Sequence, residues 1–96
     1  KESLMITNWK VVVGSPHTVQ VSQTMSGEIV TTLDNREIMH RHLSRGEDMD
    51  YPFKIDGKPC SLHILYKLER YGGMATMETW HHELLLDGVK QYPEKG

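Results

Sequence analysis

Residues 56–69 read Asp-Gly-Lys-Pro-Cys-Ser-Leu-His-Ile-Leu-Tyr-Lys-Leu-Glu, and this stretch decides the fold class. Alternate residues are apolar, namely Cys60, Leu62, Ile64, Tyr66 and Leu68. The residues between them are polar, apart from Leu65. Because successive side chains of a β-strand point to opposite faces, this alternation predicts a half-buried strand over residues 60–68. The preceding Asp56-Gly57 is typical of a two-residue hairpin turn, which Lys58-Pro59 could lengthen.

Further strands are predicted on both sides of this stretch. Short runs of Val, Thr and aromatic residues are separated by Gly, Pro, Asn and Asp, as in all-β proteins. The strands expected in addition are residues 9–13, 17–24, 28–33, 37–43, 51–55, 77–86 and 89–92. Asp34-Asn35 and Asp87-Gly88 tolerate the left-handed backbone of tight hairpin turns.

Three local features qualify this strand pattern. Residues 37–43 are also compatible with a short helix, because Met, Arg, Leu and Glu accept helix. Pro52 cannot donate to a ladder, which places residues 51–55 at a sheet edge or a bulge. Trp80 and Leu84 are expected to face inward, and the alternation then turns His82 inward too. We therefore expect a bulge there, or a buried and hydrogen-bonded histidine.

These patterns predict an all-β protein, an antiparallel β-sandwich or flattened barrel of about eight strands in meander or hairpin order. Residues 60–68 and 77–86 form its central hairpin. The 96 residues are expected to form a single domain, 1–96, because two cores in so short a chain would each be too small.

Composition limits the partners and the compartment. Lys and Arg number 11 against 13 Asp and Glu, and no basic stripe compensates locally, so we expect no nucleic-acid partner. No apolar run approaches the roughly 20 residues of a membrane helix, and no signal-peptide pattern is visible, so we expect no membrane insertion. The single Cys60 cannot close an intrachain disulfide, which favours a reducing compartment and a cytoplasmic location.

Six histidines raise the question of a metal site. His40 and His42 would point to the same face of a strand, and His81 or His82 could add a ligand if the fold brought them together. Other possible ligands are His17, His63 and Cys60. Because the usual zinc spacings such as C-x-x-C are absent, scattered histidines are the expected interpretation. No metal or cofactor site is predicted.

No catalytic site is predicted either. Cys60 begins an apolar face, where a buried, unreactive thiol is commoner than a nucleophile. Ser26-Gly27 and Gly72-Gly73 lack the following helix of a phosphate loop and are interpreted as turns.

The six methionines could form an adaptable binding surface, although they more often fill gaps in a core. An uncovered strand edge could accept an extended peptide or another copy of the chain.

The order of these signals resembles one domain of the Fas apoptotic inhibitory molecule family. The matching signals, in chain order, are Trp9-x-Val11, His17-x-Val19, Thr24-x-Ser26-Gly27, Leu33-Asp34, Glu37-Ile38, Arg41, Glu83-Leu84-x-Leu86-Asp87-Gly88 and Tyr92. The family typically has two such domains in tandem whereas this chain holds one, and residues 65–77 are longer than the corresponding hairpin.

The resemblance implies a β-sandwich without enzymatic activity that acts through protein contacts in the cytosol. It implies three roles: restraint of death-receptor signalling, support of neurite growth and binding of misfolded protein. Components of death-receptor signalling are then candidate partners. The leading hypothesis is therefore a protein-interaction domain that docks through a strand edge or a sheet face. The alternatives are a histidine-based metal-binding domain and a structural interaction domain of a larger cytoskeletal or ciliary protein.

Overall fold

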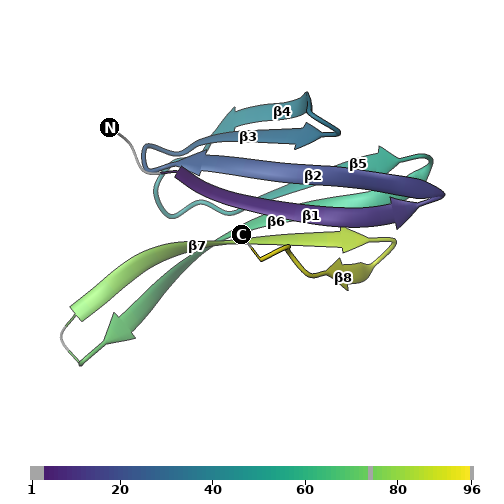
Figure 1. Cartoon of the computed structure of the whole chain (residues 1–96). Coiled ribbons are helices and arrows are strands. Elements are labelled where there is room, and N and C mark those ends of the chain that lie inside the picture. Colours follow the sequence, from purple (N-terminus) through teal and green to yellow (C-terminus); the bar gives the residue numbers. More distant parts are fainter. Residues whose placement is uncertain (1–3, 74, 96) are drawn as a thin grey trace.

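The computed structural model describes residues 4–73 and 75–95, and these residues form a β-sandwich of two four-stranded antiparallel sheets (Figure 1). The first sheet contains, in spatial order, β1 (Leu4–Val13), β2 (Ser15–Thr24), β3 (Glu28–Leu33) and β4 (Arg36–His42). The second contains β5 (Met49–Ile55), β6 (Lys58–Tyr71), β7 (Ala75–Leu86) and β8 (Val89–Gln91). Within each sheet every strand lies beside its neighbour in sequence, which confirms the hairpin order. Residues 36–42 are a strand and not a helix.

Three hairpins close through the tight turns that the sequence predicted. Both central residues of each turn have positive φ, at Asp34-Asn35, Asp56-Gly57 and Asp87-Gly88. This backbone matches the twist of the flanking strands, and Asp, Asn and Gly are the residues that tolerate it. Ile55 already pairs with Lys58, so Lys58-Pro59 begins β6 and does not lengthen the loop.

The buried hydrophobic side chains that the structure describes form one cluster between the two sheets. The buried hydrophobic residues are Trp9, Val11, Val13, Val19, Val21, Ile29, Met39, Leu43, Met49, Ile55, Cys60, Leu62, Ile64 and Leu84. They occupy alternate positions along most strands, as expected when one face of each sheet packs on a core. No helix that could cross a membrane occurs within the two described ranges.

A β-bulge in the first sheet accepts a hydrogen bond from the second sheet. Thr31 pairs with Met39 and Thr32 with Glu37, so Ile38 is the extra residue of the bulge. The Tyr51 hydroxyl of β5 donates to the Ile38 carbonyl at 3.0 Å, across the sandwich. The bulge thus leaves a carbonyl outside the ladder, and a side chain of the other sheet satisfies it.

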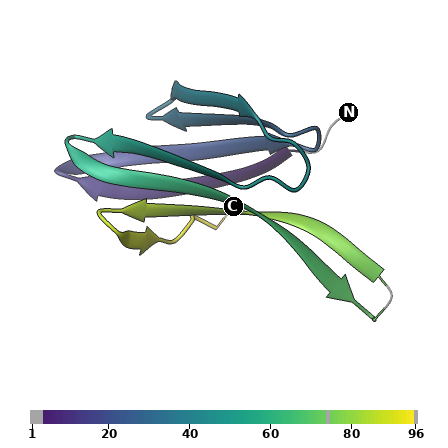
Figure 2. The same ribbon diagram turned by 180° about the vertical axis from the view of Figure 1, so that it is seen from behind.

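The β6–β7 hairpin is longer than the sandwich that it crosses. Its distal half extends beyond the first sheet in both views (Figures 1 and 2), and the molecule measures 49 × 26 × 24 Å. Leu68 has the parity of the inward residues Leu62 and Ile64, yet it is 62% exposed. The prediction that the apolar face of β6 continues inward to Leu68 is therefore wrong at its end, because no opposing sheet covers that part of the strand.

Candidate functional site

The distal part of β7 has a strand on only one side. It pairs with β6 from Ala75 to Leu86, but β8 pairs only with Leu84–Leu86. Among the described strands, none pairs with the other edge of residues 75–83. An uncovered edge presents unpaired backbone N–H and C=O groups that can bind another extended chain.

The opposite edge of the same hairpin, which belongs to β6, is partly covered. β5 pairs with β6 only as far as Ile64. Just beyond, the Tyr66 amide donates to Asp48 Oδ1 at 2.7 Å. Asp48 belongs to the loop after β4, and Arg45 of the same loop pairs with Glu78 of β7. The loop therefore occupies part of the β6 edge, where a backbone donor would otherwise be free.

The outer strands of both sheets carry features that discourage further pairing. Pro52 lies in β5, which confirms the predicted edge position. β4 is bulged and has exposed Arg, Glu and His side chains, and β8 is only three residues long. At β1, the Glu94 amide donates to the Asn8 carbonyl at 2.7 Å, so the C-terminal segment occupies part of that edge. Charges, proline, bulges and short length all protect edges from unwanted pairing.

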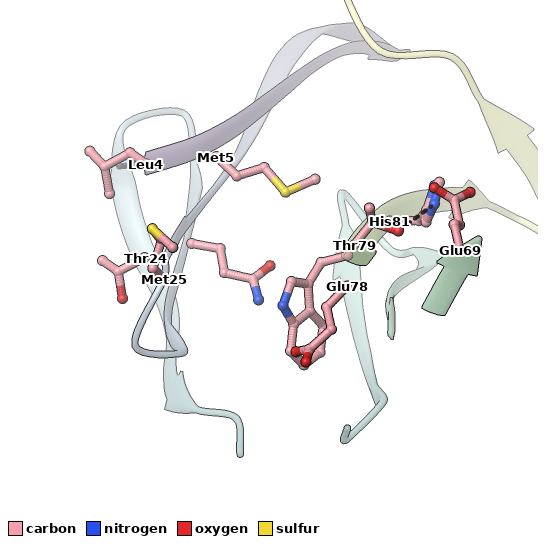
Figure 3. A pocket seen from close by; sticks show the side chains of 10 residues that line it. Leu4, Met5, Thr24, Met25, Glu69, Glu78, Thr79 and His81 are labelled. Carbon is pink, nitrogen blue, oxygen red and sulfur yellow. Dashed lines mark hydrogen bonds between the residues drawn. The ribbon is translucent and has the colours of Figure 1, made fainter. Parts of the chain in front are cut away.

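A groove with a volume of about 540 Å³ runs along the uncovered edge of β7. Its lining residues are Leu4, Met5, Gln23, Thr24, Met25, Glu69, Glu78, Thr79, Trp80 and His81. Figure 3 shows Leu4, Met5 and Thr24 of the first sheet, and Met25 of the turn after β2, across the groove from Glu78, Thr79 and His81. Consecutive residues 78–81 contribute, although their side chains alternate between the two faces of the strand. Residues from both faces of β7 therefore line the groove, together with Glu69 of β6.

One wall of the groove is held by aromatic packing. The Trp80 ring packs edge-on against Tyr66 of β6, with ring centroids 5.2 Å apart. Such a pair adds about 1 kcal/mol beyond the burial of its area. Across the groove, Met5 and Met25 are 38% and 82% exposed. Met39 and Met49 are buried in the core, so these two have the core-filling role expected of methionines.

Behind the groove, a polar cluster joins the two sheets. His82 Nε2 lies 2.7 Å from Gln23 Oε1, and His82 Nδ1 lies 2.9 Å from Thr7 Oγ1. An imidazole with its proton on Nε2 donates to Gln23 and accepts from the Thr7 hydroxyl, which uses both ring nitrogens. The ladder between β6 and β7 is continuous at His82. Of the two possibilities predicted there, the structure shows the hydrogen-bonded histidine and no bulge, and His82 is partly buried.

The His82 imidazole is neutral at ordinary pH. Burial, followed by the proximity of His81, lowers its pKa to about 4. Removal from water disfavours the charged form, and a second histidine nearby adds to that effect. The cluster therefore acts as an uncharged link between β7 and the first sheet.

Gln23 has an unused hydrogen-bond donor in the wall of the groove. The residue is 2% exposed, and its Nε2 has no partner among the described residues. A buried donor without an acceptor costs about 1–3 kcal/mol. Gln23 was not singled out from the sequence. The signal that could have identified it is the alternation of β2, which places it on the inward face with Val19 and Val21.

The histidines considered as metal ligands do not converge. His40 contacts Glu28 at 2.8 Å, and His42 contacts the Ser26 carbonyl at 2.9 Å. His81 lies 3.4 Å from the Thr79 hydroxyl, and His82 belongs to the polar cluster with Gln23 and Thr7. In the part of the chain that the structure describes, no group of three His, Cys, Asp or Glu side chains could hold a metal ion.

Cys60 is a buried thiol in the core. It is 4% exposed, its Sγ lies 3.7 Å from the Lys58 carbonyl, and burial raises its pKa. A thiol with a raised pKa is a poor nucleophile at neutral pH, because the thiolate is the reactive form.

A second histidine clasps the turns at one end of the sandwich. His17 Nδ1 lies 2.7 Å from Asp34 Oδ2, and its Nε2 lies 2.9 Å from Asp56 Oδ2. Asp34 follows β3 and Asp56 follows β5, so the clasp joins the two sheets. Ser15 Oγ is 3.4 Å from Nε2, but Nε2 already faces a carboxylate, so it is not available as a base for the serine.

Substitution of the two carboxylates should separate their effects on His17. The hydrogen bond to Asp34 is the largest cause of the raised pKa of His17, and Asp56 contributes less. Asp34→Asn should therefore lower the pKa of His17 more than Asp56→Asn does, as measured by NMR titration of the imidazole. The raised pKa means that the clasp stabilises the fold below pH 6.5, and that this stabilisation disappears as the pH rises through the folded-state pKa. An equal or reversed effect of the two variants would contradict the assigned geometry.

Comparisons of the chain with protein-family models, with curated proteins and with solved structures find no match.

Proposed function

We propose that this chain is a non-enzymatic protein-interaction domain that binds an extended segment of a partner along the uncovered edge of β7. The observation that carries the proposal is that consecutive residues 78–81 line one groove. A ligand that lies along a strand edge touches successive residues, whereas a ligand on a sheet face touches alternate ones.

The exposed hairpin also favours an added strand. A two-stranded ribbon is only marginally stable in water, and a third strand supplies both backbone hydrogen bonds and apolar contact. Leu68 and Met77 on the ribbon are 62% and 51% exposed, so apolar surface is available there.

The resemblance to the Fas apoptotic inhibitory molecule family adds a cellular setting to the proposal. It supports a cytosolic location and components of death-receptor signalling as candidate partners. Its support is the order of strand and turn signals from Trp9-x-Val11 to the Asp87-Gly88 turn and Tyr92.

Amide hydrogen exchange of the full chain tests strand addition directly. The probe is a capped ten-residue peptide with Val at alternate positions and Ser between them. A matched peptide with Pro in place of two Ser residues lacks two backbone donors and cannot form the same ladder. The first peptide should slow exchange at residues 76–83, and the second should not. Equal protection by both peptides, or protection confined to β4 or β5, would contradict the proposal.

A charge placed in the groove should weaken this binding. Met5→Glu introduces a carboxylate into the apolar wall opposite β7, and we expect the affinity for the Val-Ser peptide to fall by roughly tenfold, the equivalent of about 1.4 kcal/mol. Val12→Glu is the matched control, because Val12 is on the same strand, is 72% exposed, and does not line the groove. Calorimetric titration of the two variants checks the difference. Equal weakening by both would show that binding occurs elsewhere.

A further inference from the structure

The methionines that the structure describes fall into two groups by exposure. Met25 is 82% exposed, Met77 51% and Met5 38%, whereas Met39 and Met49 are buried. Two of the exposed residues, Met5 and Met25, line the groove beside β7, and Met77 does not. A reagent in solution therefore reaches the thioethers of the groove, while those of the core are shielded from it.

Met5 and Met25 lie on the same wall of the groove. Met5 of β1 pairs with Gln23 of β2, and Met25 follows two residues later, in the turn after β2. Figure 3 shows both methionines across the groove from Glu78 and Thr79. Met25 also lines a second, smaller cavity of about 260 Å³. A change in these two side chains would therefore alter the wall that faces a segment bound along β7.

A peroxide changes a thioether in a defined way. The sulfur lone pair attacks one peroxide oxygen, so that an S–O bond forms as the O–O bond breaks. With hydrogen peroxide, a proton shifts to the second oxygen, which leaves as water. The sulfur is oxidised by two electrons and the peroxide is reduced by two. The product, methionine sulfoxide, is polar, and methionine sulfoxide reductases convert it back to the thioether.

Gln23 provides a partner for the oxidised form of Met5. Cross-strand partners point to the same face of a sheet, with their Cβ atoms roughly 5 Å apart. Gln23 Nε2 is a buried donor without an acceptor among the described residues. A sulfoxide oxygen on the neighbouring Met5 side chain is an acceptor of the kind that this donor lacks. The wall can therefore hold the oxidised side chain, but with a polar S–O group where it had apolar surface.

We propose that Met5 and Met25 are an oxidation site, at which a peroxide forms sulfoxides that lower the affinity of the groove for an extended segment. This inference rests on the proposed function, because it concerns the regulation of the same site. An apolar side chain of the bound segment meets the thioethers favourably, whereas it would bury part of each sulfoxide without a hydrogen bond.

Hydrogen peroxide treatment of the full chain, followed by peptide mapping in a mass spectrometer, tests the site itself. Oxygen should be added at Met5 and Met25 before it is added at Met39 and Met49. The affinity for the Val-Ser peptide, measured by calorimetry, should then fall roughly tenfold. Methionine sulfoxide reductases that act on the two sulfoxide epimers should together restore it.

Replacement of the thioethers identifies which of them matter. The double variant Met5→Leu, Met25→Leu keeps an apolar wall of similar volume and should bind the peptide equally well before and after peroxide treatment. Met77→Leu is the matched control, because it removes an exposed methionine outside the groove and should leave the tenfold loss intact. Both variants keep Met74, so its oxidation cannot account for a difference between them.

The side-chain amide of Gln23 reports on the oxidised wall. Its NMR resonances should shift when the wild type is oxidised, and the single variant Met5→Leu should abolish this shift. An unchanged Gln23 amide in a chain oxidised at Met5 would overturn the contact between the two side chains.

The outcomes distinguish this inference from the proposed function. Full affinity of the oxidised wild type, or an equal loss in the oxidised double variant, would overturn the oxidation site and leave strand addition standing. Failure of the peptide to protect residues 76–83 of the untreated chain would overturn both.

Discussion

Gly27→Ala should lower the free energy of unfolding by about 3 kcal/mol, the largest effect expected of a methyl group added to any glycine that the structure describes. Gly27 is buried in the turn between β2 and β3, with φ +101°. A Cβ atom there would lie 2.1 Å from the backbone oxygen of Leu43. The Leu43 amide also donates to the Gly27 carbonyl at 2.8 Å, so the two segments cannot separate without losing that bond. Urea denaturation followed by circular dichroism measures the loss.

Gly46→Ala separates the steric clash from backbone strain. Gly46 has φ +87°, close to that of Gly27, and an added Cβ would meet no atom within 4 Å. This variant should lose only about 1 kcal/mol, from the left-handed conformation alone. If the two variants were equally stable, the close approach of Gly27 to Leu43 would not exist in solution.

His82 should make the protein sensitive to mild acid. Its pKa is about 4 in the folded state, against 6.5 as its ordinary value. Between these values the unfolded chain binds more protons than the folded one, so the free energy of unfolding decreases as the pH falls. Over the whole interval His82 alone accounts for a loss of about 3 kcal/mol. Denaturation curves at several pH values between 7 and 4 measure the slope.

His82→Gln isolates this effect, because glutamine keeps a donor and an acceptor but does not titrate in this range. The variant should be less stable than the wild type at pH 7 and should have a flatter profile down to pH 4. His40→Gln is the control, since His40 is an exposed histidine that hydrogen-bonds to the side chain of Glu28. Because this variant keeps His82, it should retain the acid slope that His82 produces. Identical slopes in all three proteins would mean that His82 is accessible to water in solution.

The strand pattern could be predicted from the sequence because it depends on local rules. Alternation of apolar and polar residues follows from the pleat of a strand, and the three Asp-Asn or Asp-Gly turns follow from the residues that accept positive φ. The same rules placed Pro52 on an edge strand and turned His82 inward. These features could be predicted from each residue and its few neighbours in the sequence.

The groove could not be predicted in this way, because it depends on where strands end relative to one another. The alternation places Leu68 on the inward face, but only the length of the first sheet leaves that residue exposed. The β7 edge is uncovered because β8 is short. His82 hydrogen-bonds to Thr7 and Gln23, which are 75 and 59 residues away from it in the chain. The sequence by itself determined which residues form strands and which faces are apolar. Only the tertiary structure decided which edge remains open, since packing between distant segments sets the ends of each sheet.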